Sequence, residues 1–149
     1  MRFITGLFEM DFTGFVPELG GFMVTVKLLM VLAMLAGPIL LVTFGLLYMF
    51  KPKKYANYRF GFRTYFGMGS TEAWQYTQRI AGLAYTIVGG VLFVAMIVVF
   101  CFFGKRDLLQ NVTTAAICLG VQALALLITR IVISILASVY FDGFGDRRR

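Results

Sequence analysis

The sequence predicts an all-α polytopic membrane protein with three transmembrane helices, and two observations support this prediction. The chain has 149 residues, of which 60% are hydrophobic and only 14% charged, and its mean hydropathy is +0.84. Polar residues this scarce cannot coat a soluble globule. Three apolar stretches are also long enough to cross a hydrocarbon core, which takes about 20 residues in a helix. They are Leu28–Phe50, Ile80–Phe103 and Val112–Tyr140.

The placement of Lys and Arg predicts the orientation of these spans. Most basic residues outside the spans lie either between the first two spans or in the C-terminal tail. Because the number of spans is odd, these two regions share one side of the membrane, and the positive-inside rule makes that side cytoplasmic. We therefore expect a multi-pass protein of the cytoplasmic membrane, with the N-terminus outside and the C-terminus in the cytoplasm.

The chain divides into a short N-terminal segment and one membrane domain. Residues 1–23 mix aromatic and acidic side chains and carry turn signals at Pro17 and Gly20–Gly21. This composition predicts an extracellular or interfacial segment and does not fit a signal peptide. Residues 24–149 are expected to form the three-helix domain, with a cytoplasmic loop at 51–79.

The first span contains a proline near its midpoint. Pro38 lacks a backbone N–H, so it leaves the carbonyl of Met34 without its helical hydrogen bond. Ala33 and Gly37 are four residues apart and predict that another helix approaches this face closely.

A cytoplasmic loop needs only Lys and Arg to set the orientation of the spans. The loop before the second span also contains an ordered mixture of glycine, aromatic and polar residues. It ends in a helix start signal, with Ser70 as N-cap and Glu72 in the first turn. Trp74 and Gln78 then share one helix face, so we expect the loop to fold back onto that face. The candidate binding residues in the loop and helix are Asn57, Gly61, Arg63, Thr64, Ser70, Glu72, Trp74, Gln78 and Arg79.

Two charged residues of this segment have alternative interpretations. Arg63 is either one more positive-inside charge or a planar donor that binds backbone carbonyls, Glu72 or an anionic head group. Glu72 is the one acid in the loop and the start of the second span. We expect it to pair with Arg63, Arg79 or Arg130.

The third span carries one charge and a partly polar face. Gln122 precedes Arg130 by eight residues and Ser134 follows it by four, so all three lie near one side of a helix. A charge within a span faces the bundle interior or a wet cavity, or extends to the nearer interface. These residues are the candidate intramembrane polar site.

The amino-acid composition argues against metal binding and catalysis. There is no His, and both Cys lie in apolar stretches, so we expect no metal, no cofactor and no enzymatic activity. The basic and aromatic loop is too short and too close to a membrane to predict nucleic-acid binding.

The ordered loop residues resemble the signature of the SdpI family of bacterial membrane proteins, which is named for an immunity protein against a sporulation-delaying toxin. The matching positions are Asn57, Gly61, Phe62, Arg63, Thr64, Ser70, Trp74, Gln78, Arg79, Ile80, Ala81 and Gly82. The resemblance extends over about Leu28 to Tyr140. It implies a non-enzymatic protein that binds a peptide toxin or signal, or a cytoplasmic partner, in immunity or signalling.

Two other functions remain open from the sequence. The small size and small-residue helix faces also fit an accessory or assembly subunit of a larger membrane complex, or a homo-oligomer. A transporter or pore component is a third and weaker interpretation, since only Arg130 and the polar face of the third span favour it. In every case the lipid bilayer is an expected partner.

Overall fold

The structure, a computed structural model, describes residues 16–51, 54, 56, 61–103 and 108–148. Within these ranges it consists of the long helices α1 (Val16–Phe50), α2 (Thr71–Phe103) and α3 (Leu108–Tyr140), with a short 3₁₀ helix, η1 (Phe66–Met68), before α2. All three long helices are long and apolar enough to cross a membrane. The predicted all-α fold with three membrane-spanning helices is therefore confirmed, and the orientation of the termini stays a prediction.

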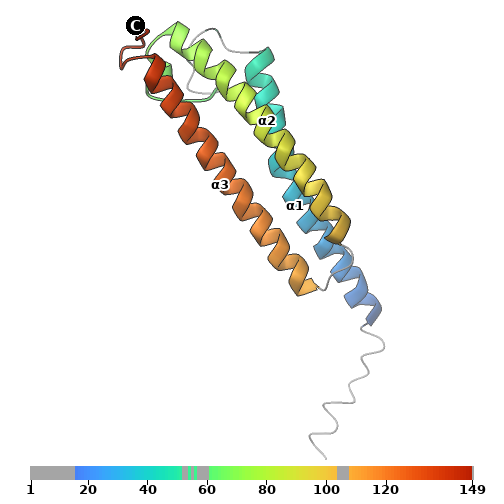
Figure 1. Ribbon diagram of the computed structural model, residues 1–149. Coiled ribbons are helices and arrows are strands. Elements are labelled where there is room, and N and C mark those ends of the chain that lie inside the picture. Colours follow the sequence, from blue (N-terminus) through green and yellow to red (C-terminus); the bar gives the residue numbers. More distant parts are fainter. Residues whose placement is uncertain (1–15, 52–53, 55, 57–60, 104–107, 149) are drawn as a thin grey trace, which may run out of the picture.

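The three long helices lie side by side, with α1 and α2 packed most extensively (Figure 1). The start of α2, the end of α3 and the C-terminal residues lie together at one end of the bundle, which we call the loop end. The start of α1 lies at the opposite end. Large apolar side chains such as Leu28, Val91 and Leu124 are exposed on the outer faces of the helices, as expected for a surface that contacts lipid.

The beginning of α1 differs from the prediction. The expected turn at Pro17 and Gly20–Gly21 is wrong, because α1 begins at Val16 and continues through these residues. Proline is tolerated in the first turn of a helix, where its missing N–H would have had no partner. By contrast, α2 begins at Thr71 as the cap signal predicts.

Glycines allow the backbones of α1 and α2 to approach closely. A Cβ atom on Gly82 would lie 2.9 Å from the carbonyl oxygen of Gly45, and one on Gly89 would lie 2.9 Å from the backbone nitrogen of Val42. Small residues at a crossing are the usual means of tight helix association in membranes. This contact fixes α2 against α1 and so positions the segment that precedes α2.

Candidate functional site

The segment before α2 is fixed to the helix through one side-chain amide. Gln78, 1% exposed, accepts a hydrogen bond from the Phe62 backbone nitrogen at 2.9 Å and donates one to the Phe62 carbonyl oxygen at 2.7 Å. The amide thereby satisfies both backbone groups of one loop residue, much as a neighbouring strand would. The expectation that the loop folds back onto the face of Trp74 and Gln78 is confirmed.

Gly61 fits closely beside this amide and the Trp74 ring. Trp74 is fully buried, and a Cβ atom on Gly61 would lie 2.6 Å from two of its ring carbons. Gly61 also has a φ of +129°, which other residues rarely adopt. Both the space and the backbone angle therefore require glycine. We call Gly61, Phe62, Trp74 and Gln78 the loop joint.

A second close contact lies at η1. The backbone nitrogen of Gly67 donates to the Thr64 hydroxyl at 3.0 Å, and Thr64 is buried. A Cβ atom on Gly67 would lie 2.6 Å from the hydroxyl oxygens of both Thr64 and Thr77. The Thr77 hydroxyl is itself buried and has no hydrogen-bond partner among the described residues. The turn therefore packs against α2 with no room for a side chain at position 67.

Ser70 joins the start of α2 to the C-terminal tail, which we define as residues 141–148. Its hydroxyl accepts a hydrogen bond from the Ala73 backbone nitrogen at 3.1 Å, which is the predicted N-cap. The same hydroxyl donates to the carbonyl oxygen of Gly145 at 2.7 Å. One side chain thus caps a helix and holds a segment 75 residues away.

The tail is an ordered turn. The carboxylate of Asp142 accepts hydrogen bonds from the backbone nitrogens of Phe144 at 3.0 Å and Asp146 at 2.8 Å. Such Asx-type bonds close a turn locally. Phe141 is 2% exposed, and its ring centroid lies 5.3 Å from that of Tyr76 on α2. The tail therefore has its own anchor in the bundle.

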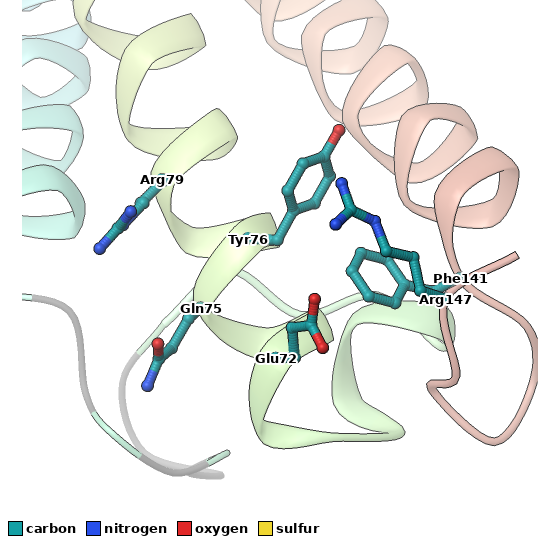
Figure 2. A pocket seen from close by; sticks show the side chains of 6 residues that line it. All are labelled: Glu72, Gln75, Tyr76, Arg79, Phe141 and Arg147. Atoms are coloured by element: carbon teal, nitrogen blue, oxygen red, sulfur yellow. The ribbon is translucent and has the colours of Figure 1, made fainter. Parts of the chain in front are cut away.

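The tail and α2 enclose a polar pocket of about 220 Å³. It is lined by Glu72, Gln75, Tyr76, Arg79, Phe141 and Arg147. Figure 2 shows Glu72 and Tyr76 extending toward the tail, whereas Gln75 and Arg79 extend to the other side of the helix. Glu72 therefore has Arg147 as its basic neighbour on the tail side of the pocket (Figure 2), and its pairing stays a prediction.

The predicted signature residues fall into two groups. The structure buries Thr64, Trp74 and Gln78 against one another or against the loop backbone. It leaves Arg63 and Arg79 exposed. Among the described residues, the hydrogen bonds that join the loop to α2 at this point link Phe62 with Gln78, next to Arg63. Asn57 lies outside the described residues.

Gln122 is connected to the proline of α1. It is 5% exposed, and its amide nitrogen donates to the carbonyl oxygen of Met34 at 2.8 Å. This is the carbonyl that Pro38 leaves without a helical partner. Gly37 makes room for the amide, since a Cβ atom there would overlap the Gln122 side-chain oxygen. The predicted close approach at Gly37 is confirmed, whereas Ala33 is exposed.

Arg130 and Ser134 line a different cavity, between α3 and residues 64–66 of the loop. Arg130 is exposed, and Ser134 is partly buried. The polar face predicted for α3 therefore divides into two parts. Gln122 contacts α1, and Arg130 lines the cavity beneath the loop.

Some residues of this region escape sequence reasoning. Thr77 is a buried polar residue of α2, and Phe141 and Gly145 place the tail against the start of α2. The only local signal for the tail is its Asp-Gly turn chemistry at Asp142. Among the described residues no group of three or more His, Cys, Asp or Glu side chains lies close enough to hold a metal ion.

The chain was compared with protein-family models, curated proteins and solved structures. A family model described as the SdpI/YfhL protein family matches residues 53–140, which include the loop joint, α2 and α3. The comparison with curated proteins found no match, and neither did the comparison with solved structures.

Proposed function

The chain belongs to the SdpI/YfhL protein family, and from this we propose that it is a non-enzymatic membrane protein that acts by binding a peptide or protein partner at the loop end. Its role would be immunity to a peptide toxin, or signalling. The positive-inside rule favours a cytoplasmic location for this surface. The absence of His from the chain favours binding over acid–base catalysis.

The observation behind this proposal is the division of the signature residues into scaffold and surface. Trp74 and Gln78 are buried in the loop joint, whereas Arg63, Glu72 and Arg79 are exposed around it. A surface whose backbone is already fixed loses less conformational entropy when a partner binds. The buried residues thus fix the backbone that carries the exposed residues before a partner binds.

The chemistry of the exposed residues fits a peptide. On its tail side the polar pocket combines one carboxylate, Glu72, with the guanidinium group of Arg147 and the aromatic ring of Tyr76. Arg79 lies on the other side of α2 (Figure 2). A peptide segment with an acidic side chain next to an aromatic or apolar one complements such a pocket. Arg63 and Tyr65 extend the exposed surface on the loop side.

The test is co-purification with matched surface variants. The chain, tagged at its N-terminus, is purified in mild detergent from its native membranes, and co-purifying proteins are quantified against it. We expect a stoichiometric partner that is lost with Arg63→Ala or Arg79→Ala. Lys51→Ala, which also removes one exposed positive charge at the loop end, should retain the partner. Expression in a toxin-sensitive bacterium should give protection that follows the same order.

The outer face of α3 favours a second candidate function. Leu124, Ile128 and Ile135 are exposed apolar residues on this helix, and such a face also fits an accessory subunit docked in a larger membrane complex. In that case the partner would survive both arginine substitutions and be lost with Leu124→Arg. That result would replace loop-end binding with subunit docking.

A further inference from the structure

The cavity beneath the loop is lined by an arginine, Arg130, that lies within the membrane-spanning part of α3. Its volume is about 530 Å³, and its polar wall is formed by Thr64, Arg130, Ser134 and Ser138. Arg130 lies ten residues before the end of α3 at Tyr140, which corresponds to about 15 Å along the helix axis. No Asp or Glu is among the residues that line the cavity. A guanidinium at such a depth needs an anionic or strongly polar partner.

Part of the lining that α3 contributes to the same cavity is apolar. Leu127, Ile131 and Ile135 alternate with the polar residues along α3 and are exposed on its outer face. A second cavity, of about 330 Å³, begins at the adjacent Leu126 and runs against Leu40, Leu41 and Phe44 of α1. Tyr85 of α2 also lines this groove. The polar and apolar spaces therefore follow each other along α3.

We propose that these two cavities bind one anionic phospholipid from the leaflet at the loop end. Its phosphate accepts hydrogen bonds from Arg130 and from the hydroxyl of Ser134, and one acyl chain lies in the groove between α1 and α3. The planar guanidinium fork matches two phosphate oxygens, and the cavity supplies no competing carboxylate. A free phosphate would leave the apolar groove unused. This site is separate from the exposed surface proposed for the peptide or protein partner.

The test measures lipid retention by the purified full-length chain. Native mass spectrometry compares binding of phosphatidylglycerol and phosphatidylcholine with identical acyl chains. We expect one phosphatidylglycerol per chain, held more tightly than phosphatidylcholine. Arg130→Gln should weaken phosphatidylglycerol binding by about tenfold or more, since hydrogen bonds to charged groups are among the stronger ones. Lys51→Gln, which removes one exposed charge at the same end, should change it by less than about twofold.

A second variant covers the case in which Arg130→Gln does not fold. Ser134→Phe fills the cavity and keeps the arginine, and it should also lower phosphatidylglycerol binding in a chain with unchanged helical circular dichroism. Equal retention of the two lipids, or retention unaffected by both substitutions, would overturn the proposal. Displacement of the lipid by millimolar inorganic phosphate would assign the site to free phosphate. A lipid-free dimer that dissociates with Arg130→Gln would assign it to a second copy of the chain.

Discussion

Replacing Gln122 with leucine tests how α3 is held to α1 at the middle of the bundle. The Gln122 amide donates to the Met34 carbonyl oxygen at 2.8 Å, and Pro38 prevents that oxygen from receiving its usual helical hydrogen bond. Leucine keeps most of the side-chain volume but cannot donate. The change therefore removes one buried hydrogen bond and leaves a buried carbonyl oxygen without a donor.

The expected loss follows from these two effects. Hydrogen bonds between membrane helices contribute about 0.6 kcal/mol on average and about 1.7 kcal/mol at most. A buried polar group left without a partner costs about 1–3 kcal/mol in soluble proteins. We therefore expect Gln122→Leu to lower the free energy of unfolding by about 1–2 kcal/mol. Equilibrium denaturation of the purified chain in mixed micelles, followed by circular dichroism, measures this difference.

The same substitution in a Pro38→Ala background separates the hydrogen bond from packing. Alanine at position 38 restores an N–H that can bond the Met34 carbonyl oxygen within α1. Gln122→Leu should then cost clearly less than it does in the parent chain, and the double-mutant cycle gives the coupling. An equal cost in the two backgrounds would mean that Gln122 acts through its volume alone, and the reasoning from Met34 would fail.

Three further predictions concern the loop end and the orientation. Gly61→Ala should lower the free energy of unfolding by about 1–3 kcal/mol from the positive φ alone. It should also shift the fluorescence of the single tryptophan to the red, whereas an unchanged spectrum would contradict the loop joint. Arg63→Lys should impair partner binding nearly as much as Arg63→Ala, because lysine has no guanidinium fork; binding equal to the parent would reduce this residue to a charge. A reporter fused after Arg149 should be cytoplasmic, and a cysteine at position 107 in a chain without its native cysteines should react with an external thiol probe. Labelling only after permeabilisation would reverse the orientation.

Much of the fold follows from local patterns in the sequence. The three spans are evident because apolar runs of that length have few alternatives, and the start of α2 is evident because Ser70 is a short-range cap signal. The spacing of Trp74 and Gln78 likewise predicts the face that the loop covers, and that face is buried.

The contacts that complete the site depend on distant parts of the chain. The sequence identifies the free carbonyl of Met34 and the polar side chain of Gln122, but their pairing joins residues 88 positions apart. Gln78 binds the backbone of Phe62, and backbone groups leave no mark in the residue types. Gly145 meets Ser70 only because α3 returns the chain to the loop end. The hydrophobic periodicity of a single helix contains no information on these long-range contacts.

The hydrogen bond between Ser70 and Gly145 has a consequence for biosynthesis. Gly145 is synthesised after all three helices. The hydrogen bond that ties the tail to the first turn of α2 therefore forms only when α3 has been inserted. We therefore expect a chain that stalls before that point to lack this hydrogen bond and to expose the loop to proteases. A chain truncated before Phe141 should keep its three spans and yet be cleaved at the loop more readily than the full chain. Resistance of the loop to cleavage would then report that the tail has docked on α2.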